Sequence, residues 1–388
     1  PSHRRIFLQP NYLHHKPHDP FPMKETPTKM PDILPFLKDL LSLPGLSGYE
    51  DPAARLIEER WKPLVHQVSR SRLGSVHGLR RGTGNEPRPS IMIATHMDAI
   101  GLMVTTIVEG FLHVTSVGGV DARVLPGQRV HVHASGGGAD PAKPLPGVVA
   151  QPSARLLPPE AADGPVPLEH LLIDTGLPAR RVAELVQVGD LVSFASEPTE
   201  LAGETISGHT LDNRVSVAAL TVCLETLQGR EHAWDVWAVA TVQEETALLG
   251  GFTSTFQLEP SLGIAVDVTF AKGPGASDWQ TVPMGKGPTL CMGPNIHPAL
   301  HRELKELADR LEIPYSPEYA PRHTGTDAFA MQITAAGLPT AYIGIPLRYM
   351  HTPVEVVAIK DIQRAGRLLA EFIAGLTPDS LEKFAWDK

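Results

Sequence analysis

The 388-residue sequence contains only two cysteines, Cys223 and Cys291, and both lie within apolar stretches. This scarcity excludes a fold held together by disulfides and is typical of a reducing compartment. Positive charge is also scarce, because 43 acidic residues outnumber 34 basic ones and the formal net charge is -9. The acidic balance disfavours nucleic acid and anionic membranes as partners, so we expect small molecules, peptides or copies of the same chain.

Long hydrophobic runs are lacking as well. No stretch approaches the roughly 18 consecutive apolar residues of a membrane-spanning helix, and the first residues lack the apolar core of a secretory signal. We therefore expect a cytoplasmic protein. Because 42% of the residues are hydrophobic, the chain can bury a large core, which predicts two domains or one large domain with an insertion.

Three kinds of pattern divide the chain. Residues 1–30 are rich in proline and histidine without periodicity, which indicates an N-terminal extension or a vector-derived remnant. Residues 31–103 and 205–388 alternate apolar runs with helical patterns, which predicts a layered α/β domain. Residues 104–204 form short runs between glycine and proline, which predicts an inserted β-rich domain of antiparallel strands with one short helix near 178–187.

The elements of the α/β domain can be placed more closely. Continuous apolar runs rich in β-branched residues predict strands covered on both faces at 90–96, 237–243, 262–268 and 340–346. Helical periodicity follows at 213–228, 298–312, 326–337 and 359–376. Nearer the N-terminus, Ser47 and Glu50 have the spacing of a capping box ahead of another helix.

Polar side chains gather where the predicted strands end or a helix begins. The residues concerned are His96, Asp98, Asp212, Glu244, Glu245, Asp267 and His351. In open α/β sheets, ligands collect outside the carboxyl ends of the strands, where side chains from several elements converge. We therefore expect these seven residues to form one site.

The ligand types in this set suit divalent metal ions. His96, Asp212, Glu245, Asp267 and His351 supply two imidazoles and three carboxylates, which fit Zn²⁺, Co²⁺ or Mn²⁺. If one carboxylate bridges two ions, each ion has three protein ligands and keeps room for a shared water. That arrangement predicts a catalytic centre.

The two adjacent acids, Glu244 and Glu245, are expected to take separate roles. Since side chains alternate along a strand, Glu245 can turn toward a metal while Glu244 stays free to accept a proton from water and pass it to a leaving amine. The spacing of the HMD motif further suggests that Asp98 accepts a hydrogen bond from the ring of His96.

Simpler interpretations remain for single residues. Asp212 could cap its helix, Glu244 and Glu245 could be solvated acids, and Asp267 could pair with a lysine. Their joint placement favours the metal site.

A further polar segment, PRHTGTDAFAMQ, has two possible roles. Thr326 or Asp327 is expected to cap the next helix, although the loop with His323 could also line a substrate pocket. Other histidines lack the placement of a ligand, namely His113, His131, His133 and His297.

The ordered motifs THMDAIG, GHTLDNR, QEETALLGG, AVDVT, GTDA and RYMHTPVE resemble those of the dinuclear metallo-aminopeptidases, which include glutamyl, deblocking and tetrahedral aminopeptidases. The resemblance runs from about Leu34 to Leu376. It implies a three-layer mixed-sheet metallopeptidase domain with an inserted PDZ-like β-barrel for dimerisation, and relatives that assemble into tetrahedral dodecamers. It also implies that the five ligands named above hold the metals, with Asp212 as the bridge and Glu244 as the general base.

The expected reaction is hydrolysis of the first residue of a peptide with a free N-terminus. A metal-bridged hydroxide activated by Glu244 would attack the scissile carbonyl, and Glu244 would then protonate the departing amine. One departure is Ala247, where relatives commonly have glycine, which predicts a reshaped turn behind the base.

Three alternative functions use some of the same residue types. A related dimetal deacylase or carboxypeptidase would use similar ligands, but its extra domain usually falls between later ligands. An endoglucanase would need two carboxyls about 5–9.5 Å apart flanking one bond, which divergent Glu244 and Glu245 do not provide. A binding protein with a vestigial centre is disfavoured by the complete ligand set.

Overall fold

The computed structural model describes residues 30–140, 143–276 and 278–385, so most of the expected N-terminal extension, residues 1–29, lies outside the described residues. Within these ranges the larger sheet has eleven strands: β1 (Gln67–Arg70), β2 (Val76–Arg80), β3 (Ser90–His96), β10 (Thr199–Leu201), β11 (Thr205–Gly208), β12 (Asp235–Thr241), β13 (Leu262–Phe270), β14 (Thr289–Met292), β15 (Ser316–Tyr319), β16 (Thr340–Arg348) and β17 (Glu355–Ala358). Their order is β1-β2-β12-β3-β13-β16-β17-β11-β10, and β14 pairs with both β16 and β15.

The four predicted strands form the parallel centre of this sheet. β3 pairs in parallel with β12 and β13, and β13 pairs in parallel with β16. Nearly all their residues are buried, because helices cover both faces. The predicted strands are therefore confirmed, with small displacements at their ends.

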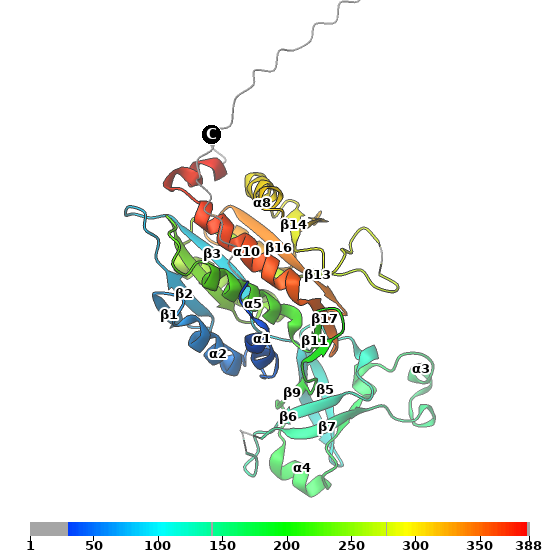
Figure 1. Ribbon diagram of the computed structural model, residues 1–388. Coiled ribbons are helices and arrows are strands. Elements are labelled where there is room, and N and C mark those ends of the chain that lie inside the picture. The colour runs from blue at the N-terminus through cyan, green and yellow to red at the C-terminus, as the bar shows by residue number, and fades with distance from the viewer. Residues whose placement is uncertain (1–29, 141–142, 277, 386–388) are drawn as a thin grey trace, which may run out of the picture. The chain divides into compact units, whose positions relative to one another are not determined.

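Helices complete a three-layer domain (Figure 1). In chain order they are α1 (Leu34–Leu41), α2 (Asp51–Trp61), α5 (Leu211–Thr226), α6 (Glu244–Ala247), α7 (Leu249–Leu258), α8 (Pro298–Arg310), α9 (Asp327–Ile333) and α10 (Ile359–Gly375). α5 packs on β3 and β13 with α10 beside it, whereas α7 and α9 contact each other and β3. α5 and α10 approach closely at Gly366, where a Cβ atom would lie 2.4 Å from the carbonyl oxygen of Ala219.

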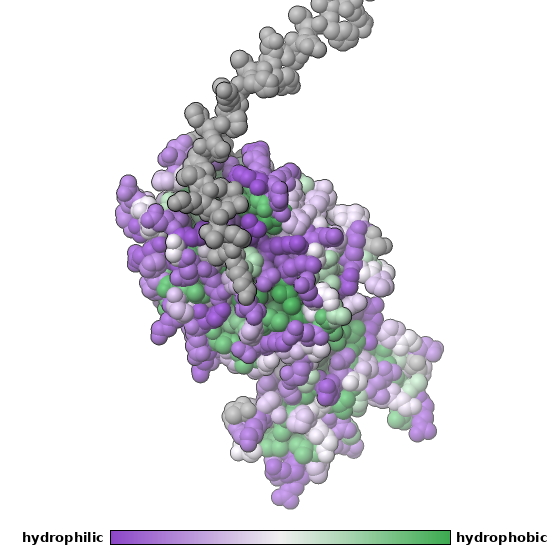
Figure 2. Space-filling view, viewed as in Figure 1, coloured by the Kyte–Doolittle hydropathy of each residue, from purple (hydrophilic) through white to green (hydrophobic). Residues whose placement is uncertain are grey.

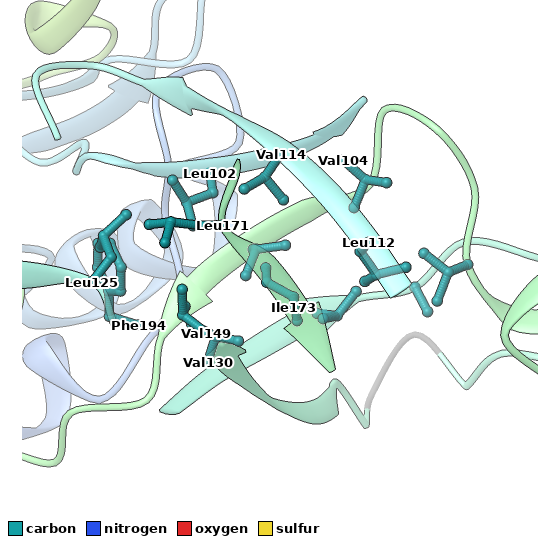
Figure 3. Packing of buried hydrophobic residues seen from close by; sticks show 14 of the residues in the cluster. Leu102, Val104, Leu112, Val114, Leu125, Val130, Val149, Leu171, Ile173 and Phe194 are labelled. Carbon is teal, nitrogen blue, oxygen red and sulfur yellow. The ribbon is translucent and has the colours of Figure 1, made fainter. Parts of the chain in front are cut away.

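The inserted segment forms a closed antiparallel barrel. In the described part of the chain its six strands are β4 (Gly101–Val108), β5 (Phe111–Val117), β6 (Arg129–His133), β7 (Leu145–Ala150), β8 (Leu172–Asp174) and β9 (Leu191–Phe194), in the order β4-β5-β8-β7-β6-β9. Alternate side chains such as Leu102, Val104, Leu112 and Val114 point inward and form a separate hydrophobic core (Figure 3). Two short helices, α3 (Pro159–Ala162) and α4 (Ala179–Leu185), lie between its strands in sequence, and α4 is the helix that the sequence predicts.

The predicted capping box of α2 is wrong. Glu50 occupies the N-cap position but its side chain makes no hydrogen bond to the helix. Ser47 donates to Asp98 at 2.6 Å, and Glu50 accepts from the backbone N–H groups of Gly48 and Gln243. Partners brought in by the tertiary fold therefore replace the local ones that the spacing suggests.

The described residues include no helix with both the length and the apolar character needed to cross a membrane.

Candidate metal centre

The seven predicted residues come together at the carboxyl edge of the parallel strands. β3 ends at His96, and Asp267 lies close to the end of β13. Asp98 follows β3, Glu244 and Glu245 begin α6 just after β12, and Asp212 lies at the start of α5. The turn after β16 supplies the seventh residue, His351. Ligands of α/β sheets collect at this edge because several loops converge there.

One half of the site is built around His96. Its Nε2 atom lies 3.2 Å from Oδ1 of Asp212, 3.5 Å from Oδ1 of Asp267 and 3.6 Å from Oε2 of Glu244. The imidazole is 2% exposed, so these oxygens surround it with little access for bulk water.

The other half is built around His351. Its Nε2 atom lies 3.4 Å from Oδ2 of Asp212 and 3.5 Å from Oε2 of Glu245. Asp212 therefore presents one oxygen to each imidazole. At 37% exposure the His351 side chain is the open edge of the site.

The barrel also contributes to this edge. Gly118 and Gly119 follow β5, and a Cβ atom at Gly119 would lie 2.8 Å from Nδ1 of His351. A Cβ atom at Gly118 would lie 3.5 Å from the Cβ of Glu245. Glycine is needed at position 119 because the barrel loop approaches the histidine ring so closely.

The charges of the site are unbalanced in a way that fits bound cations. Ligand atoms of His96, Glu244 and Asp267 lie within 4.8 Å of one another, and so do those of His96, Asp212 and Glu245. In the described chain, these four carboxylates form ion pairs only with the two histidines and with no lysine or arginine. The Oε1 atom of Glu245 is buried and lacks a hydrogen-bond partner. Buried acids without lysine or arginine partners favour bound cations, and these donors are those that Zn²⁺ and Co²⁺ accept.

Without bound cations the protonation equilibria are strongly shifted. Burial raises the pKa of Glu244 well above its usual range and that of Glu245 to about 8, and the charge of Asp212 adds to the effect on Glu245. Burial opposes ionisation of Asp212 too, but hydrogen bonds from His351 and His96 lower its pKa to about 2. The hydrogen bond to Asp212 raises the pKa of His351 to about 9. The metal-free site therefore holds protons where ions would otherwise neutralise the acids.

Asp98 has a different partner from the one expected. Its Oδ1 lies 3.3 Å from Nδ1 of His96, but the ring nitrogen makes no hydrogen bond. Asp98 instead accepts the backbone N–H groups of Glu244 at 3.1 Å and Glu245 at 3.2 Å, as well as the hydroxyl of Ser47. It thus holds the turn that carries both glutamates.

The two glutamates diverge for a reason other than strand alternation. β12 ends at Thr241, and Glu244 and Glu245 lie in the single turn of α6. The residues on either side of that turn, Gln243 and Leu248, have positive φ angles of 54° and 58°. A tight helical turn, rather than an extended strand, directs one carboxylate toward each imidazole.

The expected effect of Ala247 is not needed to explain this turn. Ala247 is the last residue of α6, and the positive φ angles fall on Gln243 and Leu248, which lie on either side of the helix. A residue with helical φ tolerates a Cβ atom, so alanine fits here without strain.

The GTDA segment provides a cap, as expected. Thr326 is the N-cap of α9 and its side chain accepts a hydrogen bond from the N–H of Ala328. Asp327 is buried beneath the site, where one oxygen accepts the hydroxyl of Thr241 and the other has no partner. Burial raises its pKa to about 7. His323 lies exposed beside Phe329.

Three buried charged residues near the site were missed by sequence reasoning. Glu50 accepts the N–H of Gln243, next to α6. Arg214 donates to the carbonyl oxygens of Leu40, Leu43 and Met97. Glu355 accepts backbone N–H groups of Asp212 and His351. Arg214 and Glu355 lie within the quoted motifs, whereas Glu50 was interpreted only as part of a capping box. Their roles were not visible because each acts on the backbone of distant segments.

Comparison with known proteins shows similarity over nearly the whole chain. A family model described as M42 glutamyl aminopeptidase matches residues 74–368. A lysyl aminopeptidase of Pyrococcus furiosus is 36% identical over 352 residues, which cover 88% of this chain and 97% of the relative.

Solved structures show the same similarity. A TET aminopeptidase from a marine sediment Thaumarchaeota archaeon superposes with a TM-score of 0.84 at 29% identity, covering 92% of this chain and 100% of the other. The TET1 peptidase of Pyrococcus horikoshii, which can assemble into a tetrahedron or a large octahedral shell, has a TM-score of 0.75 at 27% identity over 89% of this chain and 100% of its own. The residues matched by the family model include all seven predicted site residues.

Proposed function

Because the chain belongs to the M42 glutamyl aminopeptidase family, we propose that it removes the first residue of peptides with a free N-terminus at a centre of two divalent metal ions. Membership makes it a peptide hydrolase that binds divalent metal. The number of ions, their ligands and the catalytic base are part of the proposal.

The ligands divide into two sets that share Asp212. His96 and Asp267 form one set with Oδ1 of Asp212, and His351 and Glu245 form the other with Oδ2. This division would give each ion three protein ligands and would leave Glu244 free of metal. Zn²⁺ and Co²⁺ suit imidazole and carboxylate donors best, and Mn²⁺ also fits.

Glu244 is the general base of this proposal. When bound, the metal ions act as Lewis acids that polarise the scissile carbonyl and lower the pKa of water. Glu244 takes a proton from the attacking water and delivers it to the nitrogen of the departing amine. Burial makes its carboxylate a stronger base than a solvated one. Asp98 keeps the base in place by accepting the N–H of Glu244 and that of its neighbour.

The geometry also bears on the alternatives. Glu244 and Glu245 face different imidazoles inside one cluster of ligands, which disfavours a pair of acids flanking a glycosidic bond. A dimetal deacylase or carboxypeptidase shares the ligand types, but the barrel here lies between His96 and Asp212 in sequence. The aminopeptidase assignment therefore remains the best supported.

The barrel is proposed to mediate self-association. Its surface exposes several large hydrophobic side chains, including Val108, Phe111, Val148 and Val188, and Figure 2 shows hydrophobic residues among polar ones on the barrel. Exposed apolar side chains of this kind occur at interfaces between copies of a chain. These side chains and the assembly of the Pyrococcus horikoshii relative support a homodimer that builds a larger shell. Light scattering would measure the mass of the assembly.

A single observation carries the proposal, namely that Asp212 presents one carboxylate oxygen to each of two imidazoles within a cluster of acids. The test uses chelated protein to which Zn²⁺, Co²⁺ or Mn²⁺ is restored in turn, with aminoacyl anilides and their N-acetylated counterparts as substrates. We expect metal-dependent release from the free-amine substrates only. Cleavage of the acetylated series at an equal rate would contradict an aminopeptidase, because only that activity requires the free amine.

A further inference from the structure

Glu355 is a buried carboxylate that the proposed mechanism leaves without a role. It is the first residue of β17 and is 2% exposed. Its Oε2 atom accepts the backbone N–H of Asp212 at 3.1 Å, and its Oε1 atom accepts the backbone N–H of His351 at 3.0 Å. One side chain therefore uses each of its oxygens to hold a different residue of the site.

The position of β17 explains how one side chain reaches both residues. β17 pairs with β11, which leads into Asp212, and with β16, which leads into His351. Glu355 lies opposite Gly208, the last residue of β11. The strand that carries Glu355 thus lies between the two segments that deliver the ligands.

Both delivering segments have backbone conformations that need outside support. Thr210, just before Asp212, has a φ angle of 68°, and His351 has a φ angle of 63°. Residues other than glycine keep such angles only where the surrounding structure fixes them. Two hydrogen bonds from a buried carboxylate provide that support directly.

We propose that Glu355 is a positioning residue that couples Asp212 to His351 and so sets the affinity for the metal ion held between them. The inference rests on the proposed dinuclear centre and extends it to a residue that touches neither metal nor substrate. Asp98 offers a parallel, since it accepts the N–H groups of Glu244 and Glu245. Two buried carboxylates then fix the backbones of four site residues.

The chemistry of glutamine makes this role testable. The two N–H donors bond to different oxygens of Glu355, and a carboxylate offers both as acceptors. Glutamine keeps the size of Glu355 but offers one oxygen and one NH₂ group. The NH₂ group would face a backbone N–H group, and that N–H would lose its acceptor. Partners that orient metal ligands typically change metal affinity by roughly 10- to 100-fold when they are altered, and we expect the Glu355→Gln variant to weaken binding at one of the two sites by that factor.

The experiment titrates the chelated full-length chain with Co²⁺ and follows the visible d–d absorption, which reports ligand geometry at each site. Glu355→Gln and Glu355→Asp are compared with wild type. Asp361→Asn is the matched control, because Asp361 is also buried and accepts two backbone N–H groups, from Gly285 and Gly287, neither of which is a site residue. Thermal unfolding of each metal-free variant measures stability in parallel.

We expect wild type and Asp361→Asn to bind two Co²⁺ ions with the same affinities, even where the control is less stable. Glu355→Gln should bind the ion held by Asp212 and His351 10- to 100-fold more weakly, with an altered absorption band. Glu355→Asp keeps two acceptor oxygens and should recover part of the affinity. If the glutamine variant does not fold, the aspartate variant alone tests the role of Glu355.

Wild-type affinity for both ions in every folded Glu355 variant would overturn the role of Glu355 while leaving the metal centre intact. Equal losses of affinity in the control and the Glu355 variants would also overturn it, because the effect would then be one of general stability. A wild-type chain that binds no Co²⁺ would instead overturn the proposed centre and this inference with it.

Discussion

Replacing Glu244 with glutamine tests the proposed role of Glu244 as the general base. The side chain is 8% exposed and its Oε2 lies 3.6 Å from Nε2 of His96, so an amide of the same shape fits without a cavity. Glutamine cannot accept a proton from water at neutral pH. General base catalysis typically contributes about 10²- to 10⁴-fold, so we expect kcat to fall by about that factor, or roughly 2.7–5.4 kcal/mol in activation free energy at 1.36 kcal/mol per tenfold.

The same substitution makes a prediction about stability. Burial and the neighbouring acids Asp267 and Asp327 raise the pKa of Glu244, so the ionised group is unfavourable in the metal-free protein. Folding at neutral pH therefore requires proton uptake by this carboxylate, which a neutral amide does not need, and we expect the metal-free variant to unfold at a temperature equal to or above that of wild type. Loss of activity would then be separated from loss of structure.

The assay measures kcat on an aminoacyl anilide, with metal content determined by elemental analysis after dialysis. Glu306→Gln on α8 is the control, because Glu306 is exposed and remote in sequence from every site residue. We expect the Glu244 variant to retain two metal ions per chain. Wild-type turnover would refute the role of Glu244 as base, and loss of one ion would make Glu244 a ligand instead.

Three further predictions concern the surroundings of the site. Asp98→Asn leaves one acceptor oxygen for the N–H groups of Glu244 and Glu245, so kcat should fall roughly 10- to 100-fold with metal still bound; an unchanged kcat would contradict the positioning role of Asp98. Burial raises the pKa values of Glu50 and Asp327 to about 7 from 4.5 and 3.8. The protonated carboxyl groups therefore stabilise the folded state at low pH, and this contribution to the free energy of unfolding is lost as the pH rises through about 7. The chelated protein should accordingly unfold at a lower temperature at pH 8 than at pH 5.5, and the opposite order would show that these groups are not protonated in the folded state. Restoring Zn²⁺ to 100 times its Kd should stabilise the chain by about 2.7 kcal/mol for each site, and an unchanged unfolding temperature would exclude a centre that binds only the folded state.

Local patterns were sufficient for the central strands. β3 and β13 consist of consecutive apolar residues because both faces are covered, and this pattern is visible without any knowledge of the partners. The family model matches residues 74–368, so the ordered motifs identified the family correctly. The short-range capping box at Ser47 and Glu50 failed, since a spacing of three residues cannot show that Asp98 and Gln243 are better partners.

Local patterns also failed to predict the backbone conformation within the site. The sequence placed Glu244 and Glu245 after an apolar run, but their divergence comes from the α6 turn between two residues with positive φ. The two side chains do diverge, as predicted, but alternation along a strand is not the cause. A backbone turn of this kind depends on the acceptor that holds it, here Asp98.

The sequence by itself determined which residue types stand where apolar strands end, because burial on both faces and the chemistry of histidine and carboxylate ligands are properties of short segments. Only the tertiary structure decided that Asp212 would lie between His96 and His351, that a barrel loop would close on His351 through Gly119, and that Glu355 would hold two ligand backbones at once. These contacts join residues far apart in the chain, and their distances depend on strand pairing and turn geometry that no local pattern records.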